Sequence, residues 1–202
     1  MMSSNGKTDV LRLIRDEIVG LEHSPLYAYR VANNYHPVIG EWSHDAHIIF
    51  VGEAPGKNEA LKARPFCGAA GKILDELLAS AGLLRSAVYI TNIVKDRPPE
   101  NRDPLPEEIN IYGPFLDRQI AIIQPKVIAT LGRYSMSYIL GTFDVKEASL
   151  SISQNHGMMF AAQTPYGEIK IVPLYHPAAA IYNRKLLETL KKDFMVLKQF
   201  AN

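Results

Sequence analysis

The sequence contains a single cysteine, Cys67, among its 202 residues. One cysteine cannot form an internal disulfide or supply the ligands of an all-cysteine metal site. The sequence also lacks an apolar run of membrane-spanning length, and its first residues, MMSSNGKTDVLRL, lack the apolar core of a signal peptide. We therefore expect a cytoplasmic protein whose chemistry depends on side chains other than cysteine.

An excess of charge of one sign is also missing. The 22 lysines and arginines nearly balance the 21 aspartates and glutamates, for a net charge of +1. This balance argues against a protein that coats nucleic acid through bulk electrostatics. The charge is uneven along the chain, because the first 60 residues hold five basic and eight acidic residues, whereas the rest hold 17 and 13. Residues 61–202 can therefore present a local basic face.

Residues 1–202 are predicted to form one domain. Hydrophobic residues make up 47% of the sequence and charged residues 21%, which is the balance of a globular protein. The length suffices for one α/β domain with a full core. In the N-terminal segment, 1–45, the helical spacing of apolar residues at 10–21 predicts a helix with Thr8 as its cap, followed by an irregular stretch.

Strand and helix patterns alternate along the rest of the sequence. Short β-branched apolar runs predict four strands, and the stretches between them predict helices. The predicted strands lie at 46–51, 87–91, 126–131 and 170–175, and the predicted helices at 69–81, 106–123, 133–140 and 183–200. This alternation predicts an α/β fold with a central, mostly parallel four-stranded sheet flanked by helices on both faces.

Polar segments rich in glycine or proline follow all four predicted strands. They are GEAPG (52–56), TNIVKDRPPENRDP (91–104), LGR (131–133) and HPAAA (176–180). Because ligands bind such sheets beyond the carboxyl ends of the strands, the four segments should converge on one crevice. Together with RPFCGAAGKILDELL (64–78), they resemble the uracil-DNA glycosylase superfamily, most closely family 4. The resemblance implies that family's fold and the excision of uracil from DNA by a monofunctional glycosylase, in base excision repair.

The chemistry of uracil excision explains why such residues are needed. Breaking the N-glycosidic bond builds positive charge on the sugar and negative charge on the base, so a catalyst must stabilise both and hold the base outside the stack. His176 matches the family histidine that donates a hydrogen bond to uracil O2 as a neutral imidazole. Asn92 matches the asparagine that pairs with uracil N3 and O4 and rejects cytosine. Phe66 matches the aromatic residue that stacks on the base.

The GEAPG loop and a nearby glutamate are also implicated by the resemblance. Ala54 is expected to bring backbone polar groups close to uracil and the attacking water, because the flanking glycines let the chain approach closely. Glu53 and Glu59 match acidic positions of the family, and one of them is expected to orient the water or stabilise the sugar cation. The residues do not say which, and both also fit exposed loop carboxylates.

The resemblance implies a DNA-binding surface on two loops. Contacts with backbone phosphates are expected from Lys95, Arg97, Asn101 and Arg102. Arg184, with Ile181 and Tyr182, matches a loop that related enzymes insert into the minor groove, and which residue is the wedge is open. The expected partner is uracil-containing DNA, single- or double-stranded, bound by a monomer associated with the nucleoid.

One feature of family 4 is missing from the sequence. Typical members hold a [4Fe-4S] cluster through four cysteines, and the cluster pins the N-terminal segment to the body of the protein. The positions that match those cysteines are here Ser24, Tyr27, Asp96 and Tyr112. We therefore expect no iron-sulfur cluster, no metal and no other cofactor. The hypothesis for what replaces the cluster is packing among Tyr27, Tyr29, Tyr35, Trp42 and Tyr112.

Two other functions remain compatible with these motifs. One is a non-catalytic protein that keeps the fold and binds damaged bases, which would retain uracil-containing DNA without releasing the base. The other is a glycosylase for hypoxanthine, xanthine or a mismatched base, since a fold alone does not fix the substrate. Asn92 favours uracil over these bases.

Overall fold

The computed structural model describes residues 3–146 and 151–201. The α-helices are α1 (Ser4–Val19), α2 (Tyr27–Ala32), α3 (Lys57–Lys62), α4 (Ala69–Ser80), α5 (Pro106–Ile123), α6 (Arg133–Thr142), α7 (Ile152–Asn155), α8 (Ala179–Tyr182) and α9 (Lys185–Phe194). The strands are β1 (Glu41–Trp42), β2 (Ile48–Gly52), β3 (Tyr89–Asn92), β4 (Val127–Leu131), β5 (Phe160–Thr164) and β6 (Gly167–Leu174). Within these ranges, no helix combines the length and the apolar character needed to cross a membrane.

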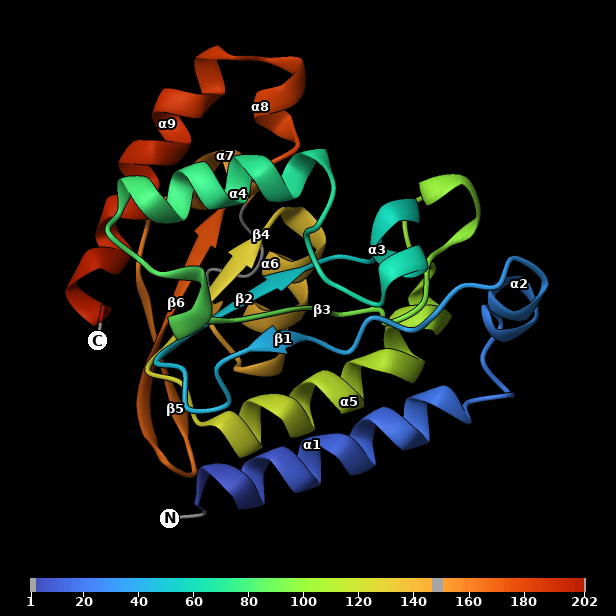
Figure 1. The fold of residues 1–202 in the computed structure, drawn as a ribbon. Helices are drawn as coiled ribbons and strands as arrows, with labels where there is room; N and C mark the ends of the chain where they lie inside the picture. Colours follow the sequence, from blue (N-terminus) through green and yellow to red (C-terminus); the bar gives the residue numbers. More distant parts are fainter. Residues whose placement is uncertain (1–2, 147–150, 202) are drawn as a thin grey trace.

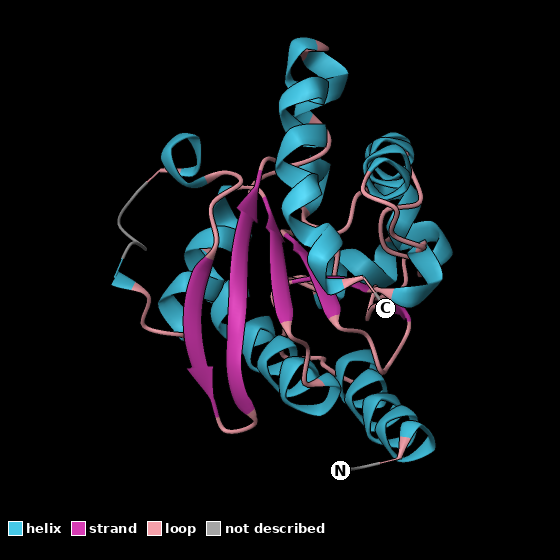
Figure 2. Cartoon of the chain, turned by 90° about the vertical axis from the view of Figure 1, so that its left-hand side faces the viewer, coloured by secondary structure: helices cyan, strands magenta, loops and turns pink. Residues whose placement is uncertain are grey.

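The strands form one sheet in the order β1-β3-β2-β4-β6-β5. The four predicted strands are its parallel centre: β3 and β4 both pair with β2, and β6 pairs with β4. The predicted α/β fold is confirmed, with two more strands than expected. Both additions are antiparallel edges: β1 has only two residues, and β5 is the first arm of a hairpin with β6. Figure 2 shows helices on both sides of the strands.

Two cores lie on the two faces of the sheet, and β2 contributes to both by alternation. Ile48 and Phe50 pack in the core that contains residues of α4 and α9, whereas Ile49 and Val51 pack in the core that contains residues of α1, α5 and α6. Side chains of a strand point alternately to opposite faces, so a strand covered on both sides is apolar throughout. In Figure 1, α4 and α9 lie above the sheet and α1 and α5 below it.

The N-terminal segment differs from its prediction in two places. Helix α1 begins earlier than expected: Ser3 is the N-cap and its hydroxyl accepts from the Gly6 amide, while Thr8 lies inside the helix. The stretch predicted to be irregular contains α2, which lies beside the loop that follows β3 (Figure 1). The last predicted helix, 183–200, is α9 followed by 3-10 turns at 195–200.

Candidate active site

A cavity of about 380 Å³ lies beyond the carboxyl ends of the central strands. Its size falls in the range of pockets for small ligands. It is lined by Glu53, Ala54, Gly56, Glu59, Phe66, Ala70, Asn92, Asn101, His176 and Ala178. All six residues predicted for catalysis or uracil binding are therefore brought together, from four separate segments of the chain. In Figure 1, the arrow of β2 points toward α3, at this end of the sheet.

Gly52, the last residue of β2, leaves the space in which the side chains of Asn92 and Phe66 lie next to each other. A Cβ atom at Gly52 would collide with Asn92 Oδ1 and would lie 2.8 Å from Cζ of the Phe66 ring. Only glycine leaves room for both side chains at this point. Asn92 pairs with Gly52 in the parallel register of β2 and β3 and is 2% exposed. The amide of Asn92 and the ring of Phe66 are thus fixed next to each other at the strand ends.

The loop that carries Phe66 is held by Glu59. One oxygen of its carboxylate, Oε1, accepts hydrogen bonds from the backbone amides of Cys67 (3.0 Å) and Gly68 (2.7 Å). Gly68 is the N-cap of α4, so the negative charge lies at a helix N-terminus, where it is favoured. Phe66 itself has a φ of +48°, a conformation that is strained for a bulky residue. Glu59 therefore stabilises the strained turn that presents the Phe66 ring to the cavity.

His176 has the tautomer of a hydrogen-bond donor. Its Nδ1 accepts from the backbone amide of Ala178 at 3.1 Å, so the proton of the neutral ring resides on Nε2. Burial lowers the pKa of His176 to about 4, against a weak opposing effect of Glu59. The ring is therefore neutral at physiological pH. It lies 5.6 Å from the Phe66 ring, centroid to centroid.

Glu53 is the carboxylate with an unusual charge state. Burial, reinforced by the negative charge of Asp103, raises the pKa of Glu53 to about 7, and Arg133 opposes the shift. Arg133 is instead paired with Asp103 at 2.7 Å. A carboxyl group that titrates near neutrality can both accept and release a proton at working pH. Of the two predicted acidic residues, Glu53 thus has the properties of an acid–base group and Glu59 those of a loop anchor.

Lys95 corrects the predicted phosphate-binding set. Its side chain is fully buried, and its Nζ donates to Thr91 Oγ1, to the backbone oxygen of Asn92 and to Gln119 Oε1, at 2.6–2.8 Å. The three acceptors match the three N–H groups of an ammonium. A lysine enclosed in this way cannot reach a phosphate on the surface, so the predicted contact is wrong. Lys95 instead supports Asn92 from beneath the cavity.

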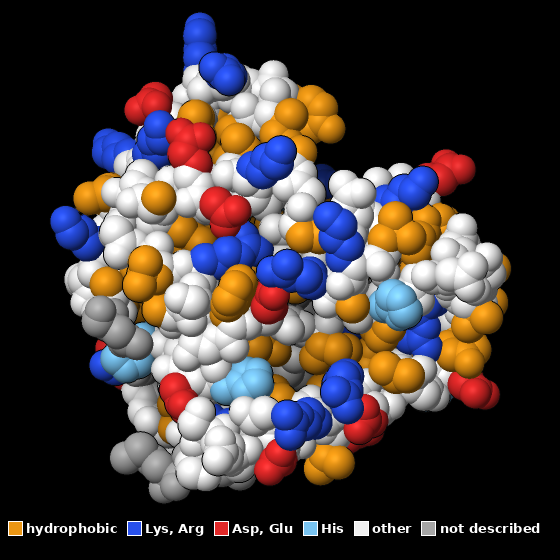
Figure 3. Space-filling model, in the orientation of Figure 1, with side chains coloured by type: hydrophobic (Ala, Val, Ile, Leu, Met, Phe, Trp, Pro, Cys, Tyr) orange, Lys and Arg blue, Asp and Glu red, His pale blue; other side chains and the backbone are white. Residues whose placement is uncertain are grey.

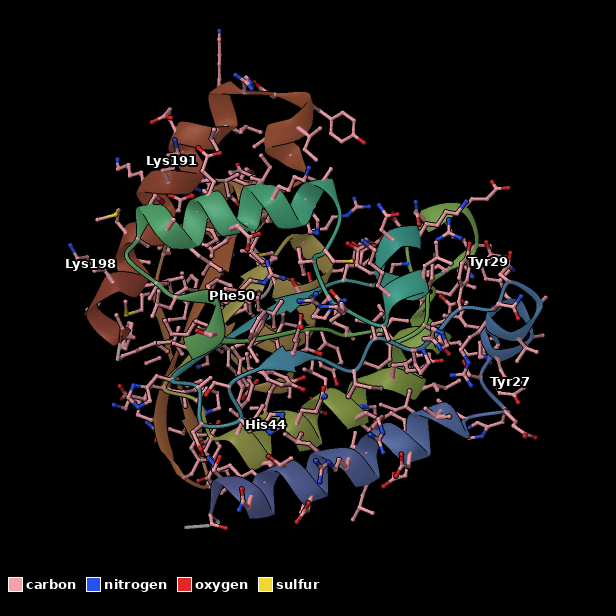
Figure 4. The ribbon with its side chains drawn as sticks, viewed as in Figure 1. Tyr27, Tyr29, His44, Phe50, Lys191 and Lys198 are labelled. Carbon is pink, nitrogen blue, oxygen red and sulfur yellow. The ribbon has the colours of Figure 1, made fainter. Side chains whose placement is uncertain are left out.

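Arg97 is also turned inward. It is 8% exposed, its Nε donates to Asn101 Oδ1 at 2.7 Å, and one terminal nitrogen donates to the hydroxyls of Tyr29 and Tyr35. Figure 4 shows Tyr29 at the α2 end of the molecule. Arg97 therefore binds Asn101, which lines the cavity. It does not reach the surface, where a phosphate would bind.

Asn101, Arg102 and Arg184 retain exposure that fits the prediction of DNA contact. Arg102 is bound to the carboxylate of Glu108 at 2.6 and 2.9 Å, and its side chain is 37% exposed. Arg184 is exposed immediately before α9. Ile181 and Tyr182 are 45% and 90% exposed. In the view of Figure 3, Lys and Arg side chains are spread among Asp and Glu side chains and form no continuous basic field.

Two contributions to the site were missed in the sequence. The amide of Ala178, two residues after His176, fixes the tautomer of the ring. Gly132, with a φ of +102°, would bring a Cβ within 3.3 Å of His176 Cβ, so it lets the histidine segment pack on the end of β4. The first contact could have been predicted from the sequence, because His176 is followed by a proline and then by Ala178, whose backbone N–H can donate to the ring. The second depends on which strands are neighbours, which the sequence does not state.

The chain is similar to known proteins over most of its length. The model of the family described as "Uracil DNA glycosylase superfamily" matches residues 39–198. A Type-4 uracil-DNA glycosylase of Sulfurisphaera tokodaii is 44% identical over 194 residues, which cover 96% of this chain and 86% of the relative. Proteins of the same name from Archaeoglobus fulgidus and Thermotoga maritima are 45% and 35% identical, over 82% and 96% of this chain and 81% and 96% of their own lengths. This chain therefore belongs to the uracil-DNA glycosylase superfamily.

Proposed function

We propose that this protein is a monofunctional uracil-DNA glycosylase that hydrolyses the bond between uracil and deoxyribose in DNA and so initiates base excision repair. One observation carries the proposal: a single cavity holds the amide of Asn92, the ring of Phe66 and a neutral His176 whose Nδ1 is already occupied. The similarity to relatives named Type-4 uracil-DNA glycosylase supports it. The proposed substrate is uracil-containing DNA, single- or double-stranded, bound by one copy of the chain.

Recognition depends on a base turned out of the helix into the cavity. Phe66 stacks on the face of the base, while the Asn92 amide accepts from uracil N3–H and donates to O4. Cytosine presents an acceptor at N3 and a donor at the neighbouring position, which leaves buried polar groups unpaired. Such mismatches are rejected strongly in enclosed sites, by about 10⁴-fold or more. The backbone of Ala54 lies at the cavity wall and is proposed to contact the base edge.

Bond cleavage uses the two titratable groups in different ways. His176 donates its Nε2–H to uracil O2, where negative charge develops as the C1′–N1 bond breaks and its electron pair leaves with the base. The Glu53 carboxylate orients a water molecule and stabilises the positive sugar. The water oxygen bonds to C1′, and Glu53 accepts the proton that it loses. Glu53 passes this proton on and returns to its carboxylate form, while the departed uracil anion takes up one proton, so the products are free uracil and an abasic site.

The DNA surface is proposed to surround the cavity. Asn101 lines it on the side of the loop after β3, where Arg102 is the next residue. The exposed Ile181 and Tyr182 belong to α8, which follows the cavity residue Ala178, and Arg184 comes shortly after α8. We propose that the basic residues bind phosphates and that one of the two apolar residues fills the stack that the base leaves.

The test is base release from a synthetic oligonucleotide with one uracil, in single- and double-stranded form. Purified protein is expected to create alkali-labile sites in at least one form, and the same strand with thymine in place of uracil serves as the control substrate. Tight binding of uracil DNA with no alkali-labile site would overturn the proposal in favour of a binding protein. Absence of both binding and cleavage would reject a role in uracil recognition.

A further inference from the structure

The positions matched to the family's cluster cysteines converge in the structure. The Tyr112 hydroxyl donates to Asp96 Oδ2 at 2.6 Å and lies 2.8 Å from Ser24 Oγ. Arg30 donates to both oxygens of Asp96, at 3.0 and 3.3 Å, and its guanidinium carbon lies 4.8 Å from the centre of the Tyr27 ring. Ser24, Arg30, Asp96 and Tyr112, here called the polar network, are all at most 5% exposed.

Within the polar network, the side-chain hydrogen bonds lead to the carboxylate of Asp96. Ser24 Oγ accepts from the Leu26 amide, and its own hydroxyl proton can be donated to the Tyr112 oxygen. The Tyr112 hydroxyl in turn donates a hydrogen bond to Asp96. Chains of this kind strengthen each member by polarisation. Among the described residues, none of the buried side-chain oxygens and nitrogens of the polar network lacks a partner.

Arg30 also closes the end of α1. Its terminal nitrogens donate to the backbone oxygens of Ile18 (3.1 Å) and Val19 (2.6 Å), in the last turn of that helix. The Ile18 oxygen also accepts from the Leu21 amide just beyond the helix, at 3.2 Å. A cation at a helix C-terminus is favoured. One guanidinium therefore joins α1 and α2 to Asp96 in the loop after β3.

An iron-sulfur cluster does not fit these residues. Such clusters are held by cysteine thiolates, whereas the four matched positions present two phenols, a hydroxyl and a carboxylate. The only cysteine, Cys67, lies on the cavity side, beside the N-terminus of α4. Ser24, Asp96 and Tyr112 are bonded to one another and Arg30 lies against the Tyr27 ring. In the part of the chain that the structure describes, none of the buried polar atoms of the polar network is left without a partner.

We infer that the polar network takes the structural place of the cluster, fastening the loop after β3 to α1, α2 and α5 without a metal. The loop is anchored by three consecutive buried side chains, Lys95, Asp96 and Arg97. Lys95 bonds to β3 and to Gln119 of α5, Asp96 belongs to the polar network, and Arg97 holds Asn101 at the cavity. Arg30 and Asp96 are thus positioning residues for the Asn92–Asn101 side of the cavity.

Aromatic packing, the hypothesis made from the sequence, describes only part of this replacement. Tyr112 is fully buried at the centre of the polar network, and Tyr29 and Tyr35 pack edge-on, 6.0 Å apart, around Arg97. Trp42 is 38% exposed and stacks near Arg64, so its inclusion was wrong. The interactions that replace the cluster are mainly polar.

The first test is the iron and acid-labile sulfide content of protein purified under anaerobic conditions. The inference predicts folded protein with no stoichiometric iron or sulfide and no visible absorbance from a cluster. Folded protein that carries stoichiometric iron and sulfide would overturn it. This measurement uses no DNA, so its outcome is independent of whether the proposed function is correct.

The second test is hydrogen exchange of the amides of Ile93 and Val94, which donate to Gly52 and Glu53 at the base of the loop. Asp96→Asn is expected to speed their exchange by about tenfold or more, because the loop opens locally once its anchor is weakened. Tyr112→Phe removes one hydroxyl and should act in the same direction to a smaller extent, which keeps the test valid if Asp96→Asn does not fold.

The matched control is Glu17→Gln, which removes an exposed ion pair with Arg118 that also joins α1 to α5. It is expected to leave exchange at Ile93 and Val94 unchanged. An equal increase in the β5–β6 hairpin and in the loop, or no increase in the loop for Tyr112→Phe and Asp96→Asn, would contradict the inference.

Discussion

Two groups of buried or half-buried polar side chains lie next to the loop after β3, and they differ in how their hydrogen bonds are used. In the polar network, Ser24, Arg30, Asp96 and Tyr112 bond to one another and to α1. In the cavity, among the described residues, the side chains of Asn92 and Glu53 form no hydrogen bond within the protein, and only Nδ1 of His176 is occupied. The first group stabilises the fold, and the second keeps its donors and acceptors for a ligand.

One short loop takes part in both groups. Lys95, Asp96 and Arg97 are consecutive, and each is turned away from solvent toward a different part of the protein. Because Lys95 and Arg97 use their N–H groups in bonds inside the protein, they are not available to bind phosphates. The polar network has its hydrogen bonds completed within the protein and holds the loop, while the cavity side chains next to the loop keep donors and acceptors available for a ligand. The comparison makes four predictions.

Breaking the polar network should have the largest effect on stability. Removing one partner of a buried ion pair leaves the other charge unpaired, at a cost of about 3–5 kcal/mol, so Arg30→Met should lower the free energy of unfolding by about this amount. The exposed pair is the control, since Glu17→Gln should cost less than about 1 kcal/mol. Urea unfolding measures both. Equal losses in the free energy of unfolding for the two substitutions would show that the buried ion pair contributes no more to stability than the exposed one.

Breaking the cavity should affect activity and leave stability nearly unchanged. His176→Ala and Asn92→Ala remove donors and acceptors aimed at the base, and each should lower kcat by about 10²–10³-fold. Exposed residues of the same types give matched controls: His23→Ala and Asn110→Ala should release uracil at the normal rate. Single-turnover release of uracil, with urea unfolding in parallel, checks the prediction. A loss of stability that accounts for the loss of activity would argue against it.

The pH dependence of catalysis should sharpen the assignment of Glu53. Its pKa is raised to about 7 by burial, so the carboxylate needed for catalysis is lost as the pH falls below that value. The rate should therefore decrease by about tenfold per pH unit below neutrality. His176, with a pKa of about 4, stays neutral through this range. In Glu53→Gln the residual rate should be flat between pH 5 and about 8, and a remaining step near 7 would assign the titration to another group.

A smaller effect is expected in the pH dependence of stability. Burial lowers the pKa of Lys95 to about 7 in the folded protein, whereas the unfolded chain has its ordinary value near 10.4. Above pH 7 the unfolded chain binds more protons at this site, so stability should rise between about pH 7 and 9, by at most about 1.4 kcal/mol per pH unit. Lys95→Met should remove that part of the slope. An unchanged slope in urea unfolding would show that Lys95 remains charged, held by its three acceptors.

The parallel strands and the cavity residues could be predicted because their signals are local runs of residues or short motifs that resemble those of a family. The strands are β-branched runs, and His176, Asn92 and Phe66 stand in short motifs at strand ends. The edge strands β1 and β5 were missed because one has two residues and the other depends on pairing with β6. Lys95 and Arg97 were expected to contact phosphates because their loop resembles one that holds the DNA backbone in the family. Their burial depends on acceptors from Gln119, Tyr29 and Tyr35, which only the folded chain brings close.

The central claim is that the cavity excises uracil and selects it through Asn92. The most direct measurement identifies the base released from matched oligonucleotides that contain uracil, cytosine, hypoxanthine or xanthine at one position, by chromatography of the free base. Uracil should be released well above the other bases, and Asn92→Ala should abolish that release. Preferred release of hypoxanthine or xanthine, or uracil release that Asn92→Ala leaves intact, would contradict this claim.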